Sequence, residues 1–198
     1  MTIVGIGSQM RVGKDCAAQG LCRDLSFKRI GFADSLKDLA MIADPLAQSS
    51  SMAVNVNIGH GRLAWMVQGM GWETAKDSYP EVRSFLQKLG DGCRQVFGKD
   101  IFVRQVLDQI KPGDNVVIPD VRFPDEAEAI KAAGGLLIRI DRPGFGTRGS
   151  HLSETALEGY DGWDVVYKND TTIHDLQTGI VAWVQSQLRN PDAVPAAR

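Results

Sequence analysis

The sequence has few of the features that mark membrane, secreted or metal-binding proteins. It contains no signal-peptide pattern and no apolar run of about 18 residues, so neither export nor a membrane span is expected. Its three cysteines, Cys16, Cys22 and Cys93, are odd in number and lack metal-site spacing, which is typical of free thiols in a reducing compartment. We therefore expect a cytoplasmic protein.

An excess of positive charge is also absent. The 22 basic and 24 acidic side chains give a net charge of −2, so no overall basic field favours nucleic acid or a membrane surface. No cluster of histidine and cysteine and no Ser-His-Asp order stands out. The composition, 43% hydrophobic and 23% charged, is that of an ordinary globular protein, and 198 residues suit one domain (1–198) with a sizeable core.

Strands and helices alternate along the chain. Apolar runs predict strands over 2–6, 28–33, 115–119, 136–140 and 164–167. Helical patterns cover 14–25, a segment from 35, 63–70, 79–89, 100–110, 125–133 and 173–188. Such alternation predicts an α/β fold with a central parallel sheet flanked by helices on both faces, which binds its ligand at the carboxyl ends of the strands.

Two of these helices carry clear side-chain signals. We expect Ser78 to cap helix 79–89, with Glu81 completing a capping box. The core positions of this helix and of helix 173–188 are predicted to be Val82, Phe85, Leu86 and Leu89, and Ile173, Leu176, Ile180 and Val184. Outside the elements we expect a mobile insertion at about 48–76, a lid at about 142–152 and a frayed tail over 190–198.

Residues 2–15 contain the most informative pattern. An apolar run leads into a loop that ends in Gly13-Lys14, as in a strand, a phosphate-binding loop and a helix that begins at about Gly13. Small residues let backbone N–H groups curl around phosphate oxygens, and the lysine reaches the β/γ-phosphates. However, Ser8 and Asp15 stand where Gly-x4-Gly-Lys-Ser/Thr has Gly and Ser/Thr, so an ordinary strand–turn–helix connection stays an alternative.

Two residues of the loop lessen these departures. Gly7, just before Ser8, can supply part of the missing conformational freedom, and Asp15 can meet Mg²⁺ as a hard oxygen ligand. Nucleotide contacts are then expected from Gly7, Ser8, Arg11, Val12, Gly13, Lys14, Asp15 and Cys16. Cys16 itself is expected to act as a small helix residue rather than as a catalytic thiol.

A second segment points to the same chemistry. The strand 115–119 is followed by Asp120-Val121-Arg122, and alternation places Asp120 and Arg122 on one side of the chain if it stays extended. The acid is suited to Mg²⁺, and the arginine can hold a phosphate through two hydrogen bonds. A surface Asp–Arg pair is the alternative, but two independent segments now predict one phosphate site.

Further candidates lie on one predicted helix face and in the lid. Arg83, Gln87 and Arg94 stand at i, i+4 and i+11, which suits a phosphate and a nucleobase edge, although a solvated charged face is the alternative. Trp72 and Tyr79 can stack on a base or belong to the core. The lid candidates, for which a plain surface loop is the alternative, are Arg142, Arg148, His151 and Glu154.

With these motifs, the chain resembles the deoxynucleoside monophosphate kinases of tailed bacteriophages, a P-loop nucleoside monophosphate kinase-like family. The matching segments, in the family's order, are 11–15, 31–37, 71–76, 79–83, 86–90, 117–128 and 151–154. The Gly-Lys-Asp ending of the loop is the family's own form. Ser8 and Cys16 depart from the family, which usually has Gly at the first position and Thr or Val at the second.

The resemblance implies a P-loop nucleotide kinase fold and transfer of the ATP γ-phosphate to a deoxynucleoside monophosphate, with Mg²⁺. Lys14 would bridge the β/γ-phosphates, and Asp15 and Asp120 would organise Mg²⁺. Arg122, Arg83 and Arg94 would hold the acceptor phosphate. Gln87 would contact the base or sugar. Arg142 and Arg148 would close onto the transferring phosphoryl group. The substrate-binding set also includes Lys37, Trp72, His151 and Glu154. A homodimer is expected at family level only.

Three other functions stay open on the sequence. A kinase of another small molecule, similar to phosphomevalonate kinase, would need no base-reading Gln87 or Trp72. A kinase of a modified base in DNA would require a basic groove, which the net charge of −2 disfavours. A non-catalytic nucleotide-binding switch has no use for a mobile arginine lid. Base preference is not indicated.

Overall fold

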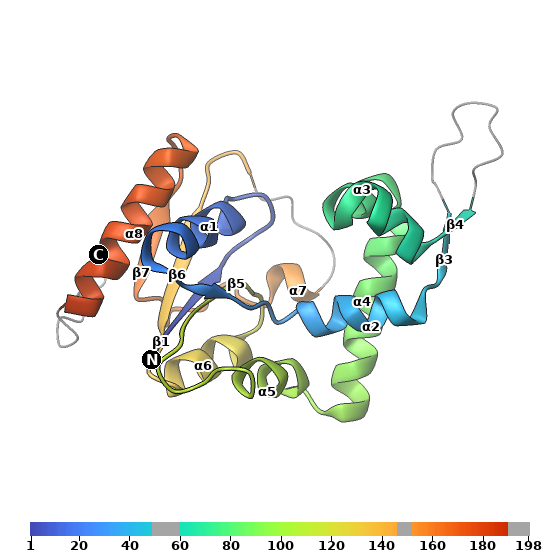
Figure 1. Cartoon of the computed structure of the whole chain (residues 1–198), viewed down its shortest axis with the longest axis horizontal. Coiled ribbons are helices and arrows are strands. Elements are labelled where there is room, and N and C mark those ends of the chain that lie inside the picture. Colours follow the sequence, from blue (N-terminus) through green and yellow to red (C-terminus); the bar gives the residue numbers. More distant parts are fainter. Residues whose placement is uncertain (49–59, 146–151, 190–198) are drawn as a thin grey trace. The chain divides into compact units, whose positions relative to one another are not determined.

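The computed structural model describes residues 1–48, 60–145 and 152–189 (Figure 1). The chain divides into two compact units, Met1–Phe32 with Val103–Arg198, and Ala33–Phe102. We call the first the sheet unit and the second the helical unit. This division does not test the expectation that 1–198 acts as one domain, which stays a prediction.

The sheet unit is built around five parallel strands in the order β2-β5-β1-β6-β7. Their bounds are β1 (Thr2–Gly7), β2 (Lys28–Arg29), β5 (Asn115–Val121), β6 (Leu136–Asp141) and β7 (Val165–Lys168). The five predicted strands are therefore confirmed. β2 is shorter than predicted because it pairs with β5 only at two positions on the edge of the sheet.

Helices cover both faces of this sheet, as predicted (Figure 1). On one face α1 (Lys14–Leu25) and α8 (Ile173–Arg189) pack against Val4, Ile6 and Val117 in a single buried cluster. On the other face Gly5 lies directly against Ile130 of α6 (Pro124–Ala132). Because β1 alternates between the two faces and is buried on both, it forms the centre of the core.

The other helices of the sheet unit are short. α5 (Ile101–Leu107) begins at the end of the helical unit and is shorter than the predicted 100–110, and α7 (Leu152–Thr155) is a single turn. In α8 the predicted core positions Leu176, Ile180 and Val184 are buried, but the prediction for Ile173 is wrong. Ile173 is 62% exposed because it is the first residue of the helix, where the chain has not yet turned onto the core.

The helical unit contains α2 (Asp34–Ala43), α3 (Leu63–Ser78), α4 (Pro80–Phe97) and an antiparallel pair of short strands, β3 (Leu46–Gln48) and β4 (His60–Arg62). The strand pair was not predicted. The core of the helical unit consists of Ala40, Ala47, Leu63, Met66 and Val82, with Phe85, Leu86 and Leu89 packed against them. The predicted core positions of α4 are therefore confirmed.

The junction of α3 and α4 differs from the prediction. The predicted cap and capping box at Ser78 are wrong, because Ser78 is the last residue of α3 and Tyr79 precedes α4 without a side-chain cap. α3 extends well beyond the predicted 63–70, with non-helical backbone at Gly71. α4 continues past Gly90 to Phe97, the condition under which Arg83, Gln87 and Arg94 share one face.

Some expectations fall on residues that the structure does not describe. The predicted tail 190–198 lies outside the described residues. So do 49–59 of the predicted insertion and 146–151 of the predicted lid.

Candidate active site

The segment from Gly7 to Lys14 joins β1 to α1, as the phosphate-loop pattern predicts. Its backbone has positive φ at Ser8 (154°), Arg11 (61°) and Gly13 (106°), so the chain curls sharply before the helix starts at Lys14. Ser8, the residue that replaces the usual glycine, thus adopts a conformation that favours glycine, and the loop retains strain at this point. The N-terminal N–H groups of α1 are oriented to hold an anion.

Glycine is needed at Gly7 and Gly13 because other side chains approach them. A Cβ on Gly7 would lie 2.4 Å from the ring of Trp163. A Cβ on Gly13 would lie 2.8 Å from Leu176 Cδ2 and 2.9 Å from Asn169 Nδ2. Gly7 is not one of the glycines with positive φ. The structure therefore supports a need for space at Gly7 rather than the conformational freedom that the sequence predicted.

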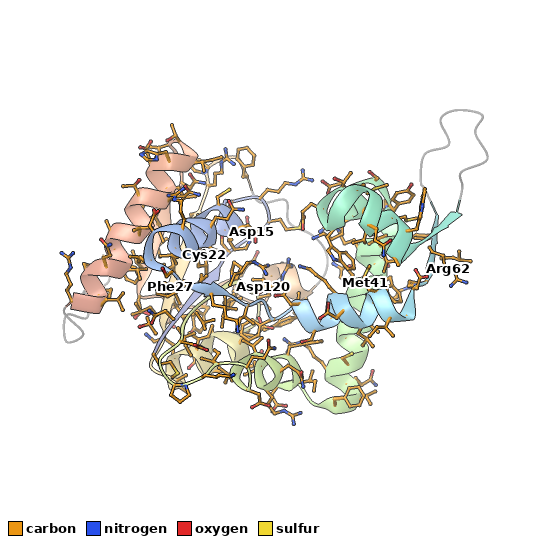
Figure 2. All side chains as sticks on the ribbon, viewed as in Figure 1. Asp15, Cys22, Phe27, Met41, Arg62 and Asp120 are labelled. Atoms are coloured by element: carbon orange, nitrogen blue, oxygen red, sulfur yellow. The ribbon has the colours of Figure 1, made fainter. Side chains whose placement is uncertain are left out.

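The Lys14 ammonium lies over its own loop. Its Nζ donates to the carbonyl oxygen of Ser8 at 2.9 Å and to that of Gln9. Asp15, labelled in Figure 2, lies in the first turn of α1 and is 77% exposed, and its Oδ1 lies 4.0 Å from Nη2 of Arg29. Lys14 and Asp15 thus both stand at the start of α1, and phosphate binding by them stays a prediction.

Two buried amides, which the sequence did not indicate, hold the loop and the start of α1. Asn169 follows β7 and is 6% exposed, and its Nδ2 donates to the Val12 carbonyl at 2.7 Å. Gln177 of α8 is 7% exposed, and its Nε2 donates to the Cys16 carbonyl at 2.9 Å. The sequence offered one usable signal, which is that Gln177 stands inside the apolar stripe of α8. A buried amide requires a hydrogen-bond partner, so this position indicates a polar contact.

The end of β5 carries the second predicted pair. Asp120, labelled in Figure 2, accepts a hydrogen bond at Oδ1 from the Phe32 N–H at 2.9 Å. The Arg122 N–H donates to Oε2 of Glu126 at 2.8 Å, and Glu126 is buried. The register of β5 against β1 shifts by one residue just before this point, so the simple alternation assumed for Asp120 and Arg122 does not continue through it.

Ser8 and Gln9 of the phosphate loop and Arg122 line one open cleft in the sheet unit. Its lining residues are Ser8, Gln9, Arg122, Arg139, Leu157, Glu158 and Trp163. The lining combines Ser8 and Gln9 with Arg122, which is far away in the sequence, but it does not include Lys14, Asp15 or Asp120. That these residues form one phosphate site stays a prediction. Arg139 was not predicted, although a charged residue inside the apolar strand β6 is a usable signal.

An aromatic pair supports the wall of this cleft. The rings of Tyr160 and Trp163 pack edge to face with centroids 5.3 Å apart, and the Tyr160 hydroxyl donates to Glu128 Oε1 at 2.7 Å. Burial, with the Glu128 hydrogen bond, raises the pKa of Tyr160 well above its usual value, so its hydroxyl stays protonated. Trp163 Nε1 is buried and has no hydrogen-bond partner among the described residues.

The lid candidates are only partly described. The Arg142 guanidinium carbon lies 3.8 Å from the centre of the Phe145 ring, a cation–π contact. Arg148, His151 and the side chain of Glu154 lie outside the described residues.

The candidates of the helical unit have local partners. Lys37 Nζ lies 3.7 Å from Asp34 Oδ1, and Arg83 Nη2 lies 3.5 Å from Asp77 Oδ1. Arg94 Nη1 donates to the Lys99 carbonyl at 2.8 Å. Trp72 packs against the core of the unit, and Gln87 of α4 is partly exposed. Substrate binding by these residues stays a prediction.

Metal and membrane features are scarce in the described part of the chain. Residues 1–48, 60–145 and 152–189 contain no group of three or more His, Cys, Asp or Glu side chains that could hold a metal ion. This is compatible with Mg²⁺ bound through one or two carboxylates and substrate phosphates. None of the helices described is both long enough and apolar enough to span a membrane.

Known proteins match this chain over much of its length. A family model described as deoxynucleotide monophosphate kinase matches residues 69–180. A protein of Acanthamoeba polyphaga mimivirus, provisionally named a deoxynucleotide monophosphate kinase, is 28% identical over 194 residues, which are 94% of this chain and 97% of the relative. The deoxynucleotide monophosphate kinase of Enterobacteria phage T4 is 31% identical over 101 residues, 48% of this chain and 42% of that enzyme.

Among solved structures, dephospho-CoA kinase from Campylobacter jejuni aligns with 96% of this chain and 98% of its own, at 12% identity and a TM-score of 0.45. The family assignment rests on the sequence matches, which include α4, the end of β5 and most of the cleft. The chain belongs to the deoxynucleotide monophosphate kinase family and is a kinase of deoxynucleoside monophosphates.

Proposed function

We propose that this kinase transfers the γ-phosphoryl group of ATP to the 5′-phosphate of a deoxynucleoside monophosphate, with Mg²⁺. An oxygen of the acceptor phosphate forms a bond to the γ-phosphorus, the bond to the β–γ bridging oxygen breaks, and ADP and a deoxynucleoside diphosphate leave. The observation that carries the proposal is the cleft that Ser8 and Gln9 of the phosphate loop share with two arginines.

The donor side of the reaction is assigned to the phosphate loop. Lys14 would exchange the carbonyl oxygens of Ser8 and Gln9 for the β/γ-phosphate oxygens of ATP, which carry full charge and bind an ammonium more strongly. Backbone N–H groups from Arg11 to Cys16 would cradle the phosphates at the start of α1. These residues position the phosphates and neutralise their charge, and this is the main work of catalysis in phosphoryl transfer.

Asp15 and Asp120 fit a Mg²⁺ site of the kind that kinases use. Asp15 offers an exposed carboxylate beside the loop, and Asp120 stands at the end of the strand next to β1. Mg²⁺ prefers such oxygen ligands together with waters and phosphates. When bound, the ion would neutralise the charge of the phosphates, while the two carboxylates hold it in place.

The acceptor is assigned to arginines and to α4. Arg122, whose backbone is fixed by buried Glu126, would hold the acceptor phosphate. Arg83 and Gln87 share a face of α4 and would bind phosphate and base or sugar, with contributions from Arg94, Lys37 and Trp72. Arg142 and Arg148, with His151 and Glu154, would form the lid that closes over the phosphates.

The test is ADP release from ATP-Mg²⁺ with dAMP, dGMP, dCMP, dTMP or 5-hydroxymethyl-dUMP as acceptor, and with phosphomevalonate as the control. We expect turnover with at least one deoxynucleotide and none with phosphomevalonate. The pattern over the five acceptors also gives the base preference. Turnover with phosphomevalonate alone, or ATP binding without turnover of any acceptor, would contradict the proposal.

Compartment and assembly are also proposals. The free thiols of Cys16, Cys22 and Cys93 suit a reducing cytoplasm. A homodimer is the expected assembly, and light scattering of the purified protein measures its mass directly against the 21.6 kDa of one chain.

A further inference from the structure

Arg139 lies in the middle of an otherwise apolar strand. β6 runs Leu-Leu-Ile-Arg-Ile-Asp, and the residues on either side of Arg139 are buried. The strand register pairs Arg139 with Gly7, the last residue of β1 before the phosphate loop. The Arg139 side chain itself is 39% exposed, and it lines the cleft beside Ser8 and Gln9.

Within the described part of the chain, one edge of the Arg139 guanidinium has a protein partner. Its Nε lies 2.7 Å from Oδ1 of Asp141, two residues further along the same face of β6. Among the described residues, no other hydrogen bond or ion pair involves this side chain. The bond to Asp141 therefore sets the direction of the guanidinium, while its terminal Nη atoms keep their donors for a ligand.

The charges in the cleft call for an anion. Arg122 and Arg139 both line it, and Glu158 is the one acidic side chain among the lining residues of this described cleft. Asp141 pairs with Arg139 through Nε, so an anion in the cleft would meet the Nη side of this guanidinium together with Arg122. A phosphate group suits this arrangement because each arginine can donate two parallel hydrogen bonds to it.

We propose that Arg139 binds a reacting phosphate group directly and is a catalytic residue of this kinase. The proposal rests on the proposed function, because the ligand chemistry is a phosphate monoester or anhydride beside the phosphate loop. The group is either the 5′-phosphate of the acceptor or the γ-phosphate of ATP, and kinetics with each substrate varied in turn distinguishes the two. Asp141 is then a positioning residue that acts through Arg139.

The experiment compares Arg139→Gln, Arg139→Lys and Asp141→Asn with the wild type, and Arg189→Gln at the exposed end of α8 is the matched control. We expect Arg139→Gln to lower kcat/KM by about 100-fold, the typical effect of losing one charged contact to the transition state. Arg139→Lys keeps the charge without the paired donors and should recover only part of this loss. Asp141→Asn should have a smaller effect of the same kind, and Arg189→Gln none.

The kinetic constants identify the phosphate. A raised KM for the deoxynucleotide alone assigns Arg139 to the acceptor phosphate. A raised KM for ATP alone assigns it to the γ-phosphate of bound ATP. A lowered kcat with both KM values unchanged assigns it to the γ-phosphoryl group in the transition state. Wild-type kinetics in Arg139→Gln would overturn the proposal. The proposal would also be overturned if the lost activity of Arg139→Gln were fully explained by a lower melting temperature, that is, by unfolded protein in the assay.

Binding measurements separate this proposal from the proposed function. Calorimetry with ATP and with each deoxynucleotide requires no turnover, so it tests Arg139 even if the wild type fails to phosphorylate any acceptor. Weaker binding of a phosphate ligand to Arg139→Gln than to Arg189→Gln would then support the phosphate contact alone. Equal binding of all ligands by the two variants, without turnover by the wild type, would overturn both proposals.

Discussion

The two units hold their candidate residues by different means. In the sheet unit, buried groups fix the loop and its neighbours: Asn169 holds the Val12 carbonyl, and Glu126 holds the backbone of Arg122. In the helical unit, Lys37 and Arg83 form ion pairs with the partly exposed carboxylates of Asp34 and Asp77. Removing one partner of a buried hydrogen bond lowers the free energy of unfolding by about 1–3 kcal/mol, whereas a surface ion pair contributes about 0–1 kcal/mol to it.

This difference suggests a division of labour. Phosphoryl transfer requires groups that are already in place before the substrate arrives, because reorganising charged groups during the reaction raises the barrier. Recognition of an acceptor tolerates side chains that rearrange when the substrate binds. The following substitutions test whether chemistry depends on the sheet unit and whether acceptor affinity, apart from the contribution assigned to Arg122, depends on the helical unit. They run from the largest expected effect to the smallest.

Lys14→Ala should have the largest effect. We expect turnover to fall by at least about 100-fold, because a charged contact to the transferring phosphate is lost. Steady-state ADP release measures it, and Lys28→Ala, at an exposed position of β2, is the matched control. Near-normal turnover in Lys14→Ala would remove the phosphate loop from the proposed site.

Asn169→Asp tests the buried support of the loop. An aspartate has the same size but cannot donate to the Val12 carbonyl, so we expect the free energy of unfolding to fall by about 1–3 kcal/mol. The KM for ATP should rise because the loop loses its anchor. Denaturant titration and kinetics measure the two effects. The control Asp170→Asn, at the exposed next residue, removes only a surface ion pair with Lys168 and should change stability by less than Asn169→Asp does. Unchanged stability and KM in Asn169→Asp would show that the anchor is dispensable.

Arg83→Ala and Gln87→Ala test the helical unit. Each should raise the KM for the deoxynucleotide by about 10-fold, with little change in the KM for ATP, because a polar contact to the acceptor contributes about 1–2 kcal/mol. Lys88→Ala, on an exposed side of the same helix, serves as the control. If both variants instead lose kcat and keep their KM for the deoxynucleotide, the division of labour between the units is wrong.

Gly71→Ala should have the smallest effect. Gly71 has φ 77° and ψ 163°, a conformation that is nearly restricted to glycine, and no heavy atom would meet an added Cβ within 4 Å. Because the position is exposed and can relax, we expect a loss of only about 1 kcal/mol in thermal stability. Gly69→Ala in the same helix has equally open space without positive φ and should be neutral or slightly stabilising. Equal effects of the two substitutions would show that the break at Gly71 carries no strain.

Local patterns predicted the sheet well and the supports of the site poorly. The strands, the loop ending in Gly13-Lys14 and the long face of α4 follow from apolar runs and helical spacing, which are properties of neighbouring residues. The partners of Asn169 and Arg139 are set by which strands lie beside β1, and the sequence gives no direct sign of that order. The cap at Ser78 was predicted wrongly because α3 extends past Gly71 to Ser78, so that Tyr79 takes the N-cap position of α4.

The most direct test of the central claim is to follow the phosphoryl group itself. The wild-type protein is incubated with γ-labelled ATP, Mg²⁺ and each deoxynucleoside monophosphate, and the labelled products are separated. The account predicts label in the deoxynucleoside diphosphate, in an amount equal to the ADP formed. Label released only as inorganic phosphate would identify a nucleotide hydrolase or switch and contradict the account.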